Sequence, residues 1–257
     1  MLRYCTLASS SSGNSAFLTD GVTKILIDLG ISTRAVEREL NTIGVDADEI
    51  DAILVTHEHG DHVRGLETWR KKHPNVKICA TKEIGDALFT ETEEIPQGEP
   101  FLLGSLVITA FATPHDTAFS VGYRVEADGH VVVSMTDLGC VSDGIYPYLD
   151  GVELLLIEAN YDPDRLRCGK YPEPLKRRIA SEHGHLSNPD CAECALHAAK
   201  CGVKTILLGH LSRENNTPRL AYETVHSKLT QNGLIPGVDV MLSVAPREGH
   251  SEWYTLE

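Results

Sequence analysis

The hydrophobic positions of this 257-residue chain fall into short apolar runs separated by polar turns. Continuous runs of this length that are rich in β-branched residues predict buried strands. Turn dipeptides at Asp20-Gly21 and Asp128-Gly129 each lie between two such runs and predict hairpins. The predicted strands cover residues 2–8, 16–19, 24–27, 53–55, 76–80, 106–111, 121–126, 130–135, 154–157, 204–208, 239–244 and 253–256.

Helices are predicted where a capping residue precedes a periodic segment. They cover residues 32–41 and 62–72, follow Thr81 and Asn188-Pro189, and extend over 217–230. The acidic, proline-interrupted stretch 91–100 is expected to be a surface loop, and the serine-rich stretch 9–15 a turn. Strands, then helices, then strands occur twice over, which predicts two β-sheets face to face with helices outside. No linker or low-complexity tract interrupts residues 1–257, so one domain suffices.

Composition places the chain among ordinary soluble proteins, with 42% hydrophobic and 23% charged residues. No apolar run approaches the ~20 residues that span a bilayer, and the first residues lack a signal-peptide pattern. We therefore expect a cytoplasmic protein without a membrane partner. Seven scattered cysteines fit reduced thiols. A zinc site formed by Cys191, Cys194, His197 and Cys201 is disfavoured, because one helix rarely surrounds a tetrahedral ion.

The net charge of −14 opposes non-specific adhesion to nucleic acid. Positive charge is nevertheless concentrated locally, and such stretches either bind phosphate or form solvated faces. The basic positions are Arg70, Lys71 and Lys72, and then Arg165, Arg167, Lys170, Lys176, Arg177 and Arg178. Both interpretations stay open.

The strongest candidate chemistry follows the apolar run 53–55. Residues His57-Glu58-His59-Gly60-Asp61-His62 place four metal-binding side chains within six positions. His57 and His59 are two residues apart and project to one side, whereas Asp61 and His62 lie beyond a glycine that lets the chain turn toward a second ion. Imidazole and carboxylate ligands suit zinc, manganese or iron.

The segment T-H-E-H-G-D-H-V-R-G-L, residues 56–66, resembles the signature of the metallo-β-lactamase-fold hydrolases. The glycine inside the motif and Gly65-Leu66 after it favour the phosphodiesterase and nuclease branch. The resemblance implies an α/β fold, a four-layer αββα sandwich. It also implies three further metal ligands at strand ends: His115, the bridging carboxylate Asp137, and His210.

Three more segments are similar to the YycJ (WalJ) branch, whose members act as 5′→3′ exonucleases on double-stranded DNA. They are E-A-N-Y-D at 158–162, Y-P-x-x-L-K-x-R-I at 171–179 and G-H-L-S-N at 184–188. Because long connections in compact domains are usually functional, the insert around 160–189 is expected to contact substrate. Within it, His185 is a candidate proton donor, and Ser187 and Asn188 are candidate phosphate contacts.

The serine-rich opening is similar to the S-G-S-x-G-N-S segment of that branch. Ser12 and Asn14 are therefore candidate substrate contacts, although a plain exposed turn explains them equally well. Asp28 and Asn160 are expected to brace the ligands from behind. For Asp28, a simple turn-forming role is the alternative.

The resemblance implies two divalent ions, Zn²⁺ or Mn²⁺ or else Fe. The first would be held by His57, His59 and His115, and the second by Asp61, His62 and His210, with Asp137 between them. A hydroxide bridging the two ions would then attack phosphorus, with Asp61 and His185 as the catalytic side chains. DNA is the expected substrate. The alternatives are a small-molecule phosphodiesterase, a thioester or lactam hydrolase, and a non-catalytic metal protein.

Overall fold

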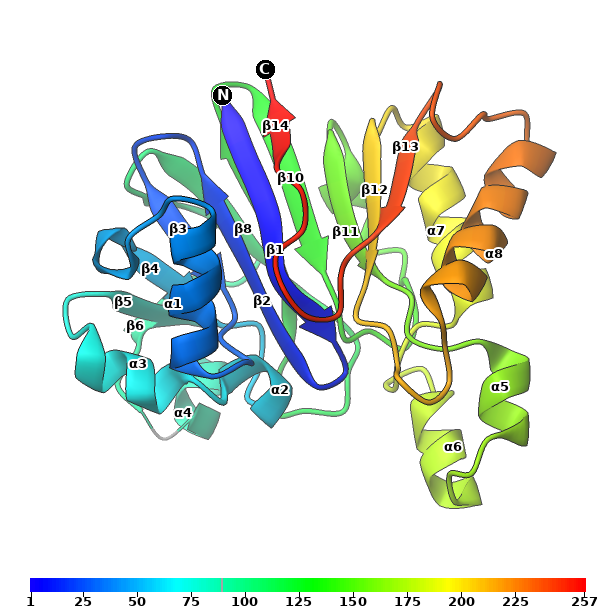
Figure 1. Cartoon of the computed structure of the whole chain (residues 1–257), viewed down its shortest axis with the longest axis horizontal. Coiled ribbons are helices and arrows are strands. Elements are labelled where there is room, and N and C mark those ends of the chain that lie inside the picture. Colours follow the sequence, from blue (N-terminus) through cyan, green and yellow to red (C-terminus); the bar gives the residue numbers. More distant parts are fainter. Residues whose placement is uncertain (89) are drawn as a thin grey trace.

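The computed structural model describes residues 1–88 and 90–257, which contain two seven-stranded sheets. The first sheet contains β1 (Leu2–Ser10), β2 (Gly13–Thr19), β3 (Lys24–Ile27), β4 (Ala52–Leu54), β5 (Lys77–Ala80), β6 (Glu93–Glu94) and β14 (Tyr254–Leu256). Its order is β14-β1-β2-β3-β4-β5-β6. Because Leu2 lies opposite Leu256, the two ends of the chain are side by side (Figure 1).

The second sheet follows the order β13-β12-β11-β10-β9-β8-β7 and is built from strands between residues 100 and 244. Its strands are β7 (Pro100–Leu103), β8 (Leu106–Ala112), β9 (Val121–Ala127), β10 (His130–Met135), β11 (Leu154–Glu158), β12 (Thr205–Gly209) and β13 (Met241–Val244). Strands β10 to β13 are parallel, whereas β7 to β10 pair antiparallel.

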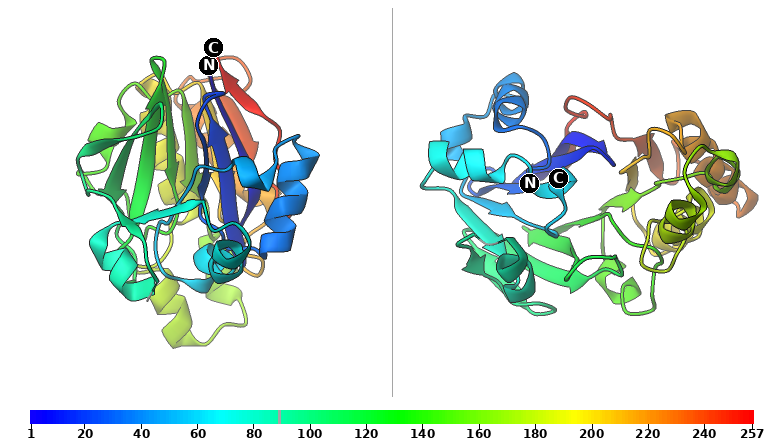
Figure 2. Two further views of the ribbon diagram at one scale, coloured as in Figure 1. Left: turned by 90° about the vertical axis from the view of Figure 1, so that its left-hand side faces the viewer. Right: turned by 90° about the horizontal axis from the view of Figure 1, so that it is seen from below.

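Helices cover the outer sides of both sheets, which gives the expected αββα layering (Figures 1 and 2). The helices are α1 (Thr33–Thr42), α2 (Gly60–Val63), α3 (Leu66–Lys72), α4 (Lys82–Leu88), α5 (Pro163–Cys168), α6 (Glu173–Ile179), α7 (Asn188–Lys200) and α8 (Pro218–Gln231), with short 3₁₀ turns η1 (Ala47–Glu49) and η2 (Tyr146–Leu149). Helices α1, α3 and α4 lie beside the first sheet, and α7 and α8 beside the second. Helices α5 and α6 protrude at the lower right of Figure 1.

Strand β11 illustrates why a fully apolar run is needed in this architecture. Leu154 and Leu156 belong to the core between the sheets, while Leu155 and Ile157 belong to the core beneath α7 and α8. Successive side chains of a strand point to opposite faces. Both faces of β11 are therefore covered, and no polar position is tolerated until Glu158.

Most of the predicted elements are confirmed, and the differences have local causes. The predicted helix 62–72 is divided into α2 and α3 at Gly65, whose backbone N–H donates to Leu29 O at 2.9 Å. A side chain at Gly65 would stand 2.4 Å from Ile31 O, so the close approach requires glycine. The predicted loop 91–100 contains the short strand β6, and the turn in 9–15 is reduced to Ser11-Ser12 because β1 and β2 extend toward it.

The strands that precede the predicted ligands all end at one edge. β3 and β4 are parallel, and β8 has the same direction as β10, β11 and β12, because two antiparallel steps separate it from β10. The carboxyl ends of parallel strands are where layered α/β folds place their sites. The connections after these strands therefore meet at a single edge of the molecule.

Candidate metal centre

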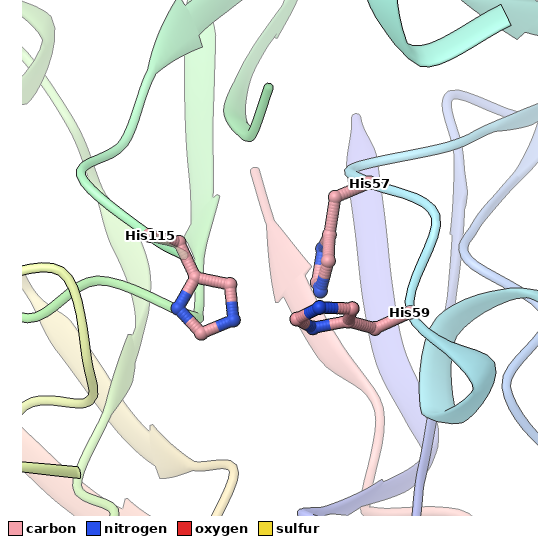
Figure 3. A group of neighbouring side chains, drawn as sticks. All are labelled: His57, His59 and His115. Carbon is pink, nitrogen blue, oxygen red and sulfur yellow. The ribbon is translucent and has the colours of Figure 1, made fainter. Parts of the chain in front are cut away.

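Three histidines from two different connections form the first cluster. His57 and His59 follow β4, and His115 follows β8, yet one ring nitrogen from each lies within 4.8 Å of the others. Figure 3 shows the three imidazoles pointing toward one another. His57 is completely buried, and its Nε2 makes no hydrogen bond. An orphaned, buried nitrogen of this kind is costly unless something absent from the protein chain satisfies it.

A second cluster joins Asp61, His62 and His210, whose ligating atoms also lie within 4.8 Å of one another. Asp61 and His62 are on the first turn of α2, which begins at Gly60, and His210 follows β12. His210 Nε2 lies 3.4 Å from Asp61 Oδ2, and both His62 and His210 are fully buried. The ring centroid of His62 nevertheless stays 4.1 Å from that of His57, so the two clusters adjoin each other.

Asp137 lies between the two clusters. Its carboxylate oxygens are 3.0 Å from His62 Nε2, 3.5 Å from His115 Nε2 and 3.5 Å from His210 Nε2. Oδ2 nevertheless makes no aligned hydrogen bond. Three imidazole nitrogens therefore converge on one buried carboxylate from both clusters.

The other ring nitrogens of these histidines are held by acceptors. His62 Nδ1 donates to Asp28 Oδ2 at 2.7 Å, His115 Nδ1 to Gly184 O at 2.8 Å and His210 Nδ1 to Glu158 Oε1 at 2.8 Å. Nε2 is therefore the ring atom of each histidine that faces Asp137, and it is the atom that can bind a metal ion once it carries no proton. These residues therefore suit divalent metal ions.

Thr56 connects the supporting groups around the first two histidines. Its backbone N–H and its hydroxyl both donate to Asp28, each at 2.8 Å, so its oxygen is free to accept from His57 Nδ1 at 3.0 Å. Asp28 thereby fixes His62 directly and His57 through Thr56. These hydrogen bonds place Asp28 directly behind the two histidines, where a bracing role was expected.

In the metal-free protein, the buried carboxylates of this site favour the protonated, positively charged form of a neighbouring histidine. Burial lowers the pKa of His62, but the carboxylates of Asp137 and Asp28 outweigh burial and raise it to about 10. The pKa of His57 is well below its usual value, first because of burial and then because of His62. Burial opposes ionisation of Asp137, yet His210 and His62 hold its pKa well below the ordinary range.

Glu158 was assigned no role from the sequence, yet it is central to the second half of the site. It is fully buried at the end of β11. Oε1 accepts from His185 Nδ1 and His210 Nδ1, both at 2.8 Å, and Oε2 accepts from the backbone N–H groups of Leu138 and Leu186. Burial raises the pKa of Glu158, but His185 and then His210 lower it to about 2. A carboxylate ending a buried strand was the signal that could have revealed it.

Three site residues adopt the left-handed backbone conformation that favours glycine: Asp28 at φ 62°, Asp137 at φ 57° and His210 at φ 55°. Each follows a strand, and each such residue costs about 1–3 kcal/mol. Of the four non-glycine residues with positive φ in the described part of the chain, only Asp128, in a hairpin turn, lies elsewhere. Strain is therefore concentrated where strands deliver these side chains.

His185 lies at the rim of the site with its side chain 21% exposed. Burial lowers its pKa, but Glu158 outweighs burial and the net shift is upward. It lines a cavity of about 190 Å³ together with Asn160, Asp116 and Tyr171. The imidazole is therefore both fixed by a carboxylate and accessible from this cavity.

Other candidate residues have internal partners. Ser187 accepts from Asp190 N at 3.2 Å as the N-cap of α7, and Asn188 is fully buried and exchanges amide hydrogen bonds with Asn216 at 3.1 and 2.8 Å. We therefore interpret Ser187 and Asn188 as structural rather than phosphate-binding. Asn160 donates to His210 O at 3.0 Å, which fits the expected bracing role.

Asn14 and Ser12, the two candidate substrate contacts in the serine-rich turn, differ in their exposure to solvent. Asn14 is buried, with Nδ2 3.3 Å from Asp61 O and 3.1 Å from His62 Nε2, so it contacts the histidine motif instead of facing solvent. Ser12 is exposed, and its carbonyl accepts from Arg64 Nη1 at 3.1 Å. Only Ser12 of this pair is open to a large substrate.

Comparison with known proteins identifies the architecture. A sequence profile described as "Beta-lactamase superfamily domain" matches residues 23–211. The chain belongs to the β-lactamase superfamily. Within this superfamily it is 37% identical over 246 residues to "Exodeoxyribonuclease WalJ" of Streptococcus pneumoniae serotype 2 (strain D39 / NCTC 7466), covering 92% of this chain and 91% of the relative.

Two further proteins are similar to this chain over nearly its whole length. "Exodeoxyribonuclease YycJ" of Bacillus anthracis is 31% identical over 240 residues, covering 90% of each chain. The metallo-β-lactamase fold protein YhfI from Bacillus subtilis superposes with a TM-score of 0.74 at 17% identity, covering 98% of this chain and 100% of that one. Together with the histidine and aspartate clusters, these relationships indicate a metal-dependent hydrolase.

Two sequence expectations outside the site can also be compared with the structure. The described part of the chain contains no helix that is long and apolar enough to cross a membrane. All seven cysteines are free, and Cys191, Cys194 and Cys201 belong to no metal-capable cluster among the described residues.

Proposed function

We propose that this protein is a divalent-metal-dependent phosphodiesterase that acts as a 5′→3′ exonuclease on double-stranded DNA. The observation that carries the proposal is the convergence of three imidazole Nε2 atoms on buried Asp137. The names of the two relatives supply the substrate class, because both are exodeoxyribonucleases that align with at least 90% of this chain.

In this proposal the two clusters hold two ions, Zn²⁺ or Mn²⁺ or else Fe. The first cluster is His57, His59 and His115, the second is Asp61, His62 and His210, and Asp137 serves both. Bound ions would supply Lewis acidity and an activated water at neutral pH. The protein fixes the imidazoles through Asp28, Thr56 and Glu158, so no reorganisation of the ligands is needed when substrate arrives.

His185 is proposed to deliver a proton to the departing 3′-oxygen. Its Nδ1 is held by Glu158 at 2.8 Å, which leaves Nε2 as the atom that can hold a transferable proton. Asp61, half-buried beside His210, is the second candidate catalytic group, because its carboxylate can orient the attacking water. Neither role requires a residue outside the described site.

We further propose that residues 1–257 act as one domain and that the 160–189 insert forms the substrate side of the site. Helix α6 supports this idea, because Leu175 and Ile179 from α6 and nearby Tyr171 line the cavity next to His185. Free cysteines fit a reducing, cytoplasmic environment. DNA is then the expected partner.

The experiment is digestion of a linear duplex labelled at either the 5′ or the 3′ end, with Mn²⁺ or Zn²⁺ added. We expect progressive, metal-dependent shortening that starts at the 5′ end and is absent in His57→Ala. Turnover of bis(p-nitrophenyl) phosphate without any duplex cleavage would indicate a small-molecule phosphodiesterase instead. Inactivity on both substrates would redirect the search to thioesters and lactams.

A further inference from the structure

A cavity of about 420 Å³ lies beside the metal centre and is lined by arginines. One wall is the Ser10–Gly13 turn, another is the first turn of α1, and a third is formed by residues 247–249. Arg64, Arg213 and Arg247 project into this space from three separate segments. We call these three residues and the space between them the arginine cavity.

The arginine cavity has an excess of positive charge. Within residues 1–88 and 90–257, none of its three guanidinium groups lies within 4 Å of a carboxylate oxygen. Burial lowers the pKa of Arg247, and Arg213 lowers it further, so two like charges are held close together. An arrangement that costs energy in the free protein is favourable once an anion binds between the charges.

Acidic residues on the same cavity do not neutralise it. Glu39 is already bound by Arg38, with Nη2 2.7 Å from Oε1, and by the backbone N–H of His250 at 3.2 Å. Glu248 is exposed to solvent and partly offsets the charge of Arg247. Three arginines without a carboxylate partner therefore face one carboxylate that is not bound by another side chain.

The basic residues of the 160–189 insert differ in this respect. Arg167 pairs with Asp164, Lys176 with Glu173, and Arg178 with Asp116. Half of the six basic side chains of that stretch are thus already occupied. In the arginine cavity, by contrast, none of the three guanidinium groups forms an ion pair within the described residues.

Short chain connections join the arginine cavity to the metal centre. Arg64 follows His62 by two residues, and Arg213 follows His210 by three. Three residues separate Cα atoms by at most about 11 Å. Arg247 donates to Leu211 O at 3.0 Å and Ser212 O at 3.4 Å, which ties the third arginine to the same segment. At a rise of about 3.4 Å per nucleotide, such a distance corresponds to roughly one to three nucleotides.

We propose that the arginine cavity binds a phosphate group of the substrate strand other than the one being cleaved. This inference rests on the proposed nuclease function and adds a specificity-determining subsite to it. Planar guanidinium groups bind phosphate oxygens in a bidentate manner, which positions a strand as well as attracting it. An acidic protein with a net charge of −14 needs such a local site to hold DNA.

The test uses Arg213→Gln, because Arg213 is exposed and its side chain makes no hydrogen bond within the described part of the chain. The matched control is Lys200→Gln, which loses the same charge at the far end of the 13-residue helix α7. With metal present, we expect KM for a duplex to rise about tenfold in Arg213→Gln. Activity on bis(p-nitrophenyl) phosphate should stay within about twofold, because one small diester cannot occupy both sites.

A binding measurement separates the subsite from catalysis. Fluorescence anisotropy of a labelled duplex in EDTA gives the slope of log K against log salt, whose magnitude decreases by about 0.9 for each phosphate that the protein no longer neutralises. We expect this decrease in Arg213→Gln, and no change in Lys200→Gln. Arg247→Lys, which keeps the charge but loses the bidentate fork, should weaken binding without changing the slope.

The outcomes are distinct. Equal losses on 5′-phosphorylated and 5′-hydroxyl duplexes support an internal phosphate in the arginine cavity, and a loss confined to the phosphorylated duplex supports a terminal one. An active wild type with Arg213→Gln indistinguishable from Lys200→Gln overturns the subsite but not the nuclease. A wild type that binds the duplex with the expected slope but never cleaves it overturns the proposed function and retains the subsite.

Discussion

Glu158→Gln is the substitution that most directly tests how the protein orients its imidazoles. The native carboxylate accepts four hydrogen bonds, two from backbone N–H groups and two from the Nδ1 atoms of His185 and His210. A glutamine has the same shape but only one acceptor end, because its NH₂ group can only donate. Two of the four donors must therefore lose their acceptor, whichever way the amide is turned.

Each buried donor left without a partner costs about 1–3 kcal/mol, so the substitution should cost roughly 2–6 kcal/mol of unfolding free energy. If the NH₂ group faces the imidazoles, these can accept from it only by moving their protons to Nε2. His210 Nε2 then carries a hydrogen toward Asp137 and no longer offers a lone pair. Metal affinity should fall together with stability.

The assay is urea unfolding in EDTA, followed by metal analysis of protein purified without chelators. Glu223→Gln is the matched control, because Glu223 is exposed on α8 and, within the described residues, forms an ion pair only with Arg219. Its unfolding free energy should stay within about 0.5 kcal/mol of wild type. If Glu158→Gln matched that control in both stability and metal content, Glu158 would not orient His210 and our account of the second cluster would be wrong.

Three further substitutions probe separate parts of the structure. Asn188→Ala should lower the unfolding free energy by about 1–3 kcal/mol, because the Asn216 amide loses its partner. The KM for DNA should not change, and a raised KM would show that Asn188 contacts the substrate. His185→Ala should retain metal and cleave the duplex more slowly, and an unchanged rate in a single-turnover assay would exclude proton delivery. Burial raises the pKa of the Glu37 carboxyl, but the Lys72 ammonium 2.7 Å away outweighs burial, and the net pKa is lowered. Ionised Glu37 therefore stabilises the folded protein above pH ~4.5, and this stability is lost as the pH falls through the folded-state pKa. Glu37→Gln should therefore be less stable than wild type by up to about 1 kcal/mol at pH 7 and nearly equal to it at pH 3 by urea unfolding; an equal difference at both pH values would contradict the ion pair.

The sequence was informative where chemistry and local pattern coincide. The H-x-H-x-D-H motif directly follows an apolar strand, so both the strand and the grouping of its side chains were predictable. His115, Asp137 and His210 were placed by resemblance, and the structure brings all three to the same edge. The carboxyl ends of parallel strands lie at the same edge of a sheet. Polar residues that follow several such strands are therefore brought together, even when they are far apart in the sequence.

Sequence reasoning was weaker for side chains whose partners lie far along the chain. Glu158 contacts His210 across 52 residues, and Asn188 contacts Asn216 across 28, so neither role is visible in a local window. Ser187 and Asn188 were predicted to contact phosphate because they belong to the G-H-L-S-N segment that resembles the YycJ branch. A serine before Asn-Pro is equally typical of a helix N-cap, and this capping role is what the structure contains.

The arginine cavity illustrates the same limit. Arg64, Arg213 and Arg247 are isolated in the sequence and form no basic run, whereas the conspicuous run in the insert is partly neutralised by its own ion pairs. Whether a basic side chain can bind an anion depends on whether the fold places a carboxylate beside it. That information is carried by tertiary packing rather than by composition.

The central claim is that Asp137 joins two metal-binding clusters into one hydrolytic site. The most direct measurement determines bound metal and duplex cleavage on the same samples of wild type and Asp137→Ala, after EDTA treatment and titration with Mn²⁺ or Zn²⁺. We predict about two equivalents of metal and progressive 5′→3′ digestion in the wild type, with both lost in Asp137→Ala while the circular dichroism spectrum is unchanged. A variant that retained two ions and full cleavage would contradict the claim.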